Sequence, residues 1–414
     1  MRTKTLGQLG IGITSVLLIS RWLSANAMFT ASEATMTYGI IAGLLFGIMG
    51  AIAFFTFGLI GKKARQQNEG AHSLMDLVQD KLDQKTKNTL FLLIGISYSI
   101  EFLLLAIGAS ILFYATFHLP IWFGVLLFIL VGLPLLLFRF IRDIGKYAIY
   151  KIGIFQSIII ILFVYLFLSS DLEKMFFGMK LYHPYMFTIQ IEELFIYTLA
   201  IFLIFLGKLL TDFGTWNILF RIKKEKISQS FILSGSIWAT IPLCFSIMIF
   251  PALSLGGFRN VTTLFYDLLN LLESPVFLLI SASTLLATLM TTYFSKLNDF
   301  LQLFETKGFQ KRKKTVYLTI LFTIVVLYGG YLLFRPDIIE LFFFTGVINA
   351  SLLFPVLFII FIKRKVHHRL VLITVLLSIM AGYLPYPSAK PIINILDSSL
   401  TSILILGVYT IRMK

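Results

Sequence analysis

The sequence predicts an all-α integral membrane protein, and three observations carry that prediction. The 414 residues are 58% hydrophobic and 13% charged, with a mean hydropathy of +0.91, whereas about 25% of residues are charged in soluble domains. Apolar runs of about 20 residues recur along the chain, and a helix of that length crosses a bilayer. Lysine and arginine are concentrated in alternate loops.

Twelve apolar runs define the expected transmembrane helices. They cover approximately residues 8–30, 38–60, 88–116, 119–139, 147–170, 192–219, 229–255, 272–299, 315–334, 338–362, 368–387 and 393–411. The polar insertion 61–87 carries Leu74, Val78 and Leu82 at helical spacing, which predicts a short amphipathic surface helix. No soluble domain fits between the runs, so we expect one transmembrane domain over 1–414.

The first run has the basic start and apolar middle of a secretory signal peptide, followed by Ala-Asn-Ala at 25–27. Arg21 and Trp22 interrupt the apolar region that cleavage needs, so we expect this segment to stay as the first helix. An arginine at membrane depth needs a partner. Glu101, in the middle of the third run, is the natural one, and the pair would be structural or form a gate.

The basic residues sort between two sets of loops. One set, with both chain ends, holds 26 of the 35 lysines and arginines, and the alternate loops hold five. The positive-inside rule therefore predicts that both termini are cytoplasmic and that the helix count is even, in a multi-pass protein of the cytoplasmic membrane. The net charge of +15 then reflects topology, with anionic lipid headgroups rather than nucleic acid as its partner.

Lys208 and Asp212 lie one helical turn apart in the apolar stretch IFLIFLGKLLTDFGTW, so they share a helix face. An ionisable residue at membrane depth costs a few kcal/mol and is a functional-site hypothesis by default. The alternative is a structural pair that neutralises itself. Gly207 and Gly214 flank the pair, and glycine permits the non-helical backbone that a helix break needs.

Enzyme and metal chemistry find no support in the sequence. The single cysteine, Cys244, excludes an intrachain disulfide and a cysteine-built metal site. No hydrolase, Walker, Rossmann or zinc pattern occurs, and the adjacent His367 and His368 fit a solvated basic loop. We therefore expect neither an enzyme nor a resident cofactor.

Four segments resemble the sodium:solute symporter family, and most closely its urea-transporter branch. They are SRWLSANAMFTASEATMTYG (20–39), GKYAIYKIGIFQ (145–156), TDFGTWNILFRIKKEKISQSFILSGSIWATIP (211–242) and SASTLLATLMTTYFSKLNDF (281–300). Their order and spacing carry the resemblance, which covers most of the chain from about residue 14 to 383.

The resemblance implies a LeuT-type fold of two inverted five-helix repeats, over about 8–170 and 192–362, with two extra helices at about 368–411. Helices 1 and 6 would be broken at mid-membrane, near Ser20–Ser24 and Asp212–Gly214. Solutes and ions bind at such breaks, where backbone donors and acceptors are exposed.

The resemblance also implies the positions of a solute site and a sodium site. Trp22 and Asn26 on helix 1, with Lys208 and Asp212 on helix 6, would contact solute, although Trp22 could instead serve packing or interfacial anchoring. The family pattern places the expected sodium ligands at the carbonyls of Val16 and Ile19 and at the hydroxyls of Ser283 and Thr284. The alternative for those hydroxyls is ordinary helix packing.

The chain departs from the family at helix 5, where Gly153 replaces the acid that supports the sodium site. Lys151 is close enough to put an ammonium group in a site built for a monovalent cation, although it could instead extend to the cytoplasmic surface. Asn217-Ile218 also replaces the usual Gln-Arg after the helix 6 tryptophan. Sodium and protons both stay open as coupling ions, with protons favoured.

The combined prediction is a secondary active transporter that moves a small polar solute across the cytoplasmic membrane by alternating access. The alternative is a transport-inactive relative that acts as a membrane sensor or assembly partner. Loss of the helix 5 acid favours the alternative, whereas retention of Ser283, Thr284 and Asp212 disfavours it. The sequence leaves the solute and the oligomeric state undetermined.

Overall fold

The computed structural model describes residues 9–68, 70–79, 81–137, 144–188, 191–258, 260–305, 313–362, 368–384 and 391–412. These residues form helices joined by short turns, and one isolated bridge pairs Leu9 with Ile222. The helices of the first half are α1 (Ile11–Trp22), η1 (Asn26–Thr30), α2 (Ala31–Tyr38), α3 (Ile40–Gln67), α4 (Leu74–Gln79), α5 (Gln84–Phe117), α6 (Ile121–Leu137), α7 (Ile144–Leu168), α8 (Leu172–Tyr182) and η2 (Pro184–Phe187). Those of the second half are α9 (Ile191–Thr211), α10 (Phe213–Arg221), η3 (Lys224–Lys226), α11 (Ile227–Met248), α12 (Phe250–Leu253), α13 (Val261–Asn270), α14 (Pro275–Glu305), α15 (Lys313–Phe334), α16 (Ile338–Phe361), α17 (His368–Tyr383) and α18 (Pro391–Arg412).

The helix pattern confirms the expected set of about twelve transmembrane segments. Among the residues that the structure describes, eight single helices are long and apolar enough to cross a membrane, and one bent pair makes a ninth. Shorter apolar helices lie at the three other expected positions, within α6, α15 and α17. The predicted amphipathic surface helix is α4, which buries Leu74, Leu77 and Val78.

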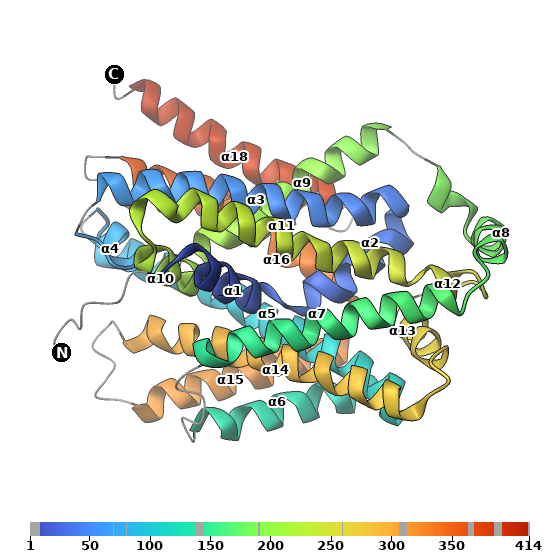
Figure 1. Ribbon diagram of the computed structural model, residues 1–414. Coiled ribbons are helices and arrows are strands. Elements are labelled where there is room, and N and C mark those ends of the chain that lie inside the picture. The colour runs from blue at the N-terminus through green and yellow to red at the C-terminus, as the bar shows by residue number, and fades with distance from the viewer. Residues whose placement is uncertain are drawn as a thin grey trace.

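The helices lie side by side and define two opposite ends of the molecule (Figure 1). The short helix α4 and the end of α10 lie at one end, while α8, α12 and α13 lie at the other. We call the α4 end the basic side, because the described lysine- and arginine-bearing segments around α4 and at the end of α10 belong to it, and the α8 end the outer side. The first described helix begins, and α18 ends, toward the basic side (Figure 1).

The first membrane span is broken after Trp22, inside the predicted interval. Leu23 has extended backbone angles of φ −72° and ψ 91°, and the chain beyond it turns by 79° into η1 and α2. A break frees carbonyl groups that water cannot reach at membrane depth. Side chains satisfy them here: Trp238 Nε1 donates to the Trp22 carbonyl at 2.9 Å, and Thr292 Oγ1 donates to the Leu23 carbonyl at 2.5 Å.

The sixth membrane span is broken at Asp212, also where predicted. Asp212 is extended (φ −84°, ψ 103°) between α9 and α10, and its side chain accepts from the backbone N–H of Thr215 as the N-cap of α10. The flanking glycines serve close packing rather than backbone freedom. A Cβ on Gly207 would lie 2.3 Å from the Asn349 carbonyl oxygen, and one on Gly214 would lie 2.2 Å from the Arg21 guanidinium.

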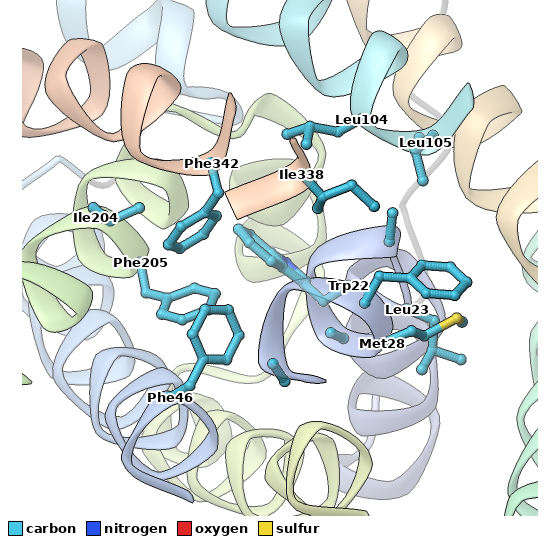
Figure 2. Close-up of a cluster of buried hydrophobic side chains, with 14 of the residues drawn as sticks. Trp22, Leu23, Met28, Phe46, Leu104, Leu105, Ile204, Phe205, Ile338 and Phe342 are labelled. Atoms are coloured by element: carbon cyan, nitrogen blue, oxygen red, sulfur yellow. The ribbon is translucent and has the colours of Figure 1, made fainter. Parts of the chain in front are cut away.

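Aromatic side chains fill the outer half of the molecule between the two breaks. The ring centroids of Phe46 and Phe205 are 5.1 Å apart, and Phe342 lies 5.2 Å and 5.7 Å from them. Figure 2 shows this trio beside Trp22, with Leu104 and Leu105 on the other side of the tryptophan. Aromatic pairs contribute about 0.5–1.5 kcal/mol beyond their burial, so this packing stabilises the fold beside Trp22.

Candidate functional site

Six charged side chains gather where the two helix breaks meet. They come from α1, α5, α9, the break itself and α14, and each side chain is at most 10% exposed. The six are Arg21, Glu101, Lys208, Asp212, Lys296 and Asp299. Three are basic and three acidic, so the formal charges cancel. Neutrality is a physical requirement here, because an unpaired charge at this depth would cost several kcal/mol.

The six groups form a chain of alternating sign. Lys208 Nζ lies 2.9 Å from Glu101 Oε1, and Glu101 Oε2 lies 3.5 Å from Lys296 Nζ. Lys296 Nζ then donates to Asp212 Oδ1 at 2.8 Å. Asp212 pairs with Arg21, whose Nη1 contacts Asp299 at the far end of the chain. We call this chain the six-charge network.

Asp212 is the most heavily bonded member of the network. Arg21 Nε and Nη2 donate to its two carboxylate oxygens at 2.5 Å and 2.6 Å, in the bidentate geometry that makes the strongest ion pairs. Tyr98 OH donates at 3.0 Å, and Lys296 at 2.8 Å. Thr215 adds its backbone N–H at 2.9 Å and its hydroxyl at 2.5 Å. Six donors therefore fix this carboxylate in one orientation.

Trp22 covers the network from the α1 break. Its Nε1 donates to Thr215 Oγ1 at 3.1 Å. The ammonium groups of Lys296 and Lys208 lie 4.7 Å and 5.6 Å from the tryptophan ring centroid, within range of cation–π attraction. Trp22 thus belongs to the site itself and contacts both lysines. Asn26 is buried farther along η1, where its Oδ1 accepts from Thr30 Oγ1 at 3.3 Å.

A cavity of about 220 Å³ reaches the network from the basic side, between α1, α7, α10 and α14. Its charged lining residues are Arg21, Arg221 and Asp299. Among the described residues, the lining includes Arg21 but not Asp212, which lies behind the guanidinium. Arg21 therefore lies between this cavity and Asp212, one of the residues expected to contact solute.

A second cationic group lies beside the α1 break. Lys151, half-buried on α7, donates from Nζ to the Ser20 carbonyl at 2.8 Å and to Thr292 Oγ1 at 2.9 Å. Thr292 in turn bonds the Leu23 carbonyl. Carbonyl and hydroxyl oxygens are the neutral ligands that suit a hard monovalent cation, and here they surround a lysine ammonium group.

The expected sodium ligands do not come together. Ser283 is exposed, and Thr284 Oγ1 donates to the Ile280 carbonyl of its own helix. Thr284 lies eight residues before Thr292, about 12 Å along α14 at 1.5 Å per residue. The Ile19 carbonyl accepts from Leu23 N–H, and Val16 is half-buried within α1. The α14 hydroxyl that lies at the break is Thr292.

Two predicted ion pairs are also wrong. Lys208 pairs with Glu101 rather than with Asp212, and Arg21 pairs with Asp212 and Asp299 rather than with Glu101. The partners missed by the sequence reasoning are Lys296, Asp299, Tyr98 and Thr215. The first two could have been found, because Lys296 lies inside an expected span and needs an acidic partner there.

No protein-family model matches the sequence, and no curated protein is similar to it in sequence. Solved structures are similar to the whole chain in fold. A Na+-coupled sialic acid symporter in a substrate-bound outward-open state matches with a TM-score of 0.68 at 11% identity, over 97% of this chain and 89% of that chain. MhsT in complex with L-phenylalanine matches with a TM-score of 0.61 at 14% identity, over 98% of this chain and 99% of that chain.

A third similar structure is MHP1, a nucleobase-cation-symport-1 family transporter in a closed conformation with bromovinylhydantoin bound. It matches with a TM-score of 0.58 at 12% identity, over 100% of this chain and 95% of that chain. These likenesses confirm the predicted LeuT-type fold.

Proposed function

We propose that the protein is a secondary active transporter of a small polar solute. The observation that carries the proposal is the convergence of six buried charges on the breaks of α1–α2 and α9–α10. Charged groups at membrane depth are expensive and are retained for function, and discontinuous helices build the solute sites of transporters with this architecture. The motif order further supports assignment to the sodium:solute symporter family, near its urea-transporter branch.

The proposed orientation places the basic side and both termini in the cytoplasm, in contact with anionic lipid headgroups. The cavity at Arg21 then opens to the cytoplasm, while the larger cavity of about 740 Å³ on the outer side, lined by Tyr38, Tyr185 and Tyr197 among others, includes none of the six charged residues in its described lining. This arrangement corresponds to the inward-facing state of an alternating-access cycle. The inverted repeats proposed for 8–170 and 192–362 would rock against each other to exchange the two openings.

We further propose protons rather than sodium as the coupling ion. The sialic acid symporter of similar fold is Na+-coupled, but the oxygens of Ser20 and Thr292 hold the Lys151 ammonium group in this chain. A protonated lysine fills such a site, and loss of the proton empties it. The cycle drives transport if the inward and outward states differ in their affinity for that proton.

The experiment is a solute screen on proteoliposomes adsorbed to a solid-supported membrane. Rapid jumps of small carboxylates, amines, amides and ureas are expected to evoke currents with at least one class, and Asp212→Asn is expected to abolish them. Lys174→Gln, at an exposed lysine on α8, is the matched control and keeps the current. Solutes that raise the melting temperature without evoking current or uptake would support the transport-inactive alternative instead.

A further inference from the structure

The Arg21 guanidinium has two bonded edges with different partners. Its Nε–Nη2 edge holds Asp212 in a bidentate pair. Its Nη1 group contacts Asp299 and lies 3.2 Å from Ser295 Oγ, both on α14. The first edge faces the protein interior, whereas the second edge faces the cavity that Asp299, Ser295 and Arg21 line together.

The two acidic partners of Arg21 are held very differently. Asp212 receives donors from four residues, which include the network cations Arg21 and Lys296 and the α10 cap contact at Thr215. The contact described for Asp299 is the one with Arg21, at the cavity surface. A second anion entering the cavity would therefore compete with Asp299 and leave Asp212 in place.

The cavity lining favours an anion. Among the described lining residues, Arg21 and Arg221 oppose the single acid Asp299, an excess of one positive charge. Arg221 Nε is buried and has no hydrogen-bond partner among the described residues, so it is a donor in need of an acceptor. The volume of about 220 Å³ is below the roughly 300 Å³ at which pockets for drug-sized ligands begin, so the anion must be small.

We propose that the cavity binds a small monocarboxylate, whose carboxylate group replaces Asp299 on Arg21 Nη1 and accepts from Ser295 and Arg221. The inference rests on the proposed transport function and names its solute class. A carboxylate is the class indicated, because the group that it displaces from Arg21 Nη1 is itself a carboxylate and accepts a charge-assisted hydrogen bond there.

Binding of the anion is coupled to uptake of one proton by Asp299. Two ionised carboxylates cannot share one guanidinium edge without strong repulsion. The charged and titratable groups facing Asp299 are Arg21 from α1, Asp212 from the α9–α10 break, Tyr98 from α5 and Lys296 on its own helix, and Arg221 from α10 shares the cavity. With Asp299 protonated, the bound solute restores three negative charges to the network.

The test is isothermal titration of the purified full-length protein in nanodiscs with acetate, acetamide and methylammonium chloride at constant ionic strength. Acetate is expected to bind, and the heats measured in buffers of different ionisation enthalpy are expected to report about one proton taken up. Asp299→Asn is expected to bind acetate at least tenfold more tightly with no proton uptake, because the competing carboxylate is gone. Arg221→Gln is expected to weaken acetate binding at least tenfold, while Asp171→Asn on the outer side leaves it unchanged.

The opposite results overturn the inference. These are binding of methylammonium or acetamide without acetate, or loss of acetate binding in Asp299→Asn that is nevertheless folded by its melting curve. Ser295→Ala gives a second measurement that removes no charge, and unchanged acetate affinity there would contradict the proposed contact. Acetate binding with no acetate uptake into proteoliposomes would retain the inference and refute transport; the readout is uptake because one anion carried with one proton moves no net charge. Transport of a neutral or cationic solute without acetate binding would support the proposed transport function and refute the monocarboxylate site.

Discussion

Replacing Asp212 by asparagine removes one charge from the six-charge network and leaves three cations against Glu101 and Asp299. The amide keeps the shape of the side chain but leaves the fork of Arg21 and the Lys296 ammonium group undercompensated at 2.5–2.8 Å. Breaking a buried ion pair from one side costs about 3–5 kcal/mol. At about 2 °C per kcal/mol for a chain of several hundred residues, the melting temperature should fall by roughly 6–10 °C.

The assay is thermal unfolding followed with a thiol-reactive dye, because the single, half-buried Cys244 on α11 becomes reactive when the helices separate. Asp212→Asn combined with Lys296→Met restores equal numbers of positive and negative charges. The double variant is therefore expected to be more stable than the sum of the two single changes predicts, by about 1–3 kcal/mol. Lys174→Met changes an exposed lysine and should stay within about 0.5 kcal/mol of the parent. A melting temperature of Asp212→Asn within 1 °C of the parent, or strict additivity in the double variant, would refute the network as described.

Three further predictions follow from the same geometry. Gly214→Ala should lower the melting temperature and the solute-evoked current, because its Cβ would lie 2.2 Å from Arg21 and 2.6 Å from Asp299 Oδ2. The control is Gly12→Ala on α1, whose Cβ meets nothing within 4 Å and which should be neutral or slightly stabilising. Equal effects of the two substitutions would contradict the close approach at Gly214. Sodium or lithium should raise the melting temperature of Lys151→Ala in a thermal-shift titration, because the oxygens of Ser20 and Thr292 no longer bind the lysine ammonium group. No effect of either cation would show that these oxygens do not form a cation site. In a Cys244→Ser background, Lys62→Cys should react with a membrane-impermeant maleimide only in inside-out vesicles, and Lys174→Cys only in right-side-out vesicles. The reverse labelling pattern would contradict the proposed topology.

The fold was predictable from the sequence because its signals are local or statistical. Apolar run length defined the spans, loop charge defined the two sides, and motif order predicted both helix breaks. Asp212 is the clearest case, since a residue type that caps helices, placed in an apolar run two residues before Gly214, marks the start of a new helix. The packing role of the glycines was harder to predict, because Gly207 packs closely against the carbonyl of Asn349, a residue on α16 far along the chain.

The pairing within the site was harder to predict, because it depends on helix rotation and depth. Lys208 and Asp212 share a helix face in an unbroken helix, but the break at Asp212 directs the carboxylate toward Arg21 and leaves Lys208 with Glu101. The sodium-ligand prediction failed for a similar reason. The family pattern pointed to Ser283 and Thr284, whose hydroxyls lie about 12 Å from Thr292 along α14, whereas Thr292 faces the break.

The most direct test of secondary transport is gradient-driven uptake into proteoliposomes of the solute that gives the largest current in the solute screen. We expect accumulation above equilibrium when a pH gradient is imposed, little or no accumulation with a sodium gradient alone, and none with Asp212→Asn. Uptake that never exceeds that of protein-free liposomes, under either gradient, would contradict the assignment as a secondary transporter. Accumulation driven by sodium alone, and unchanged in Lys151→Ala, would contradict the proposed proton coupling.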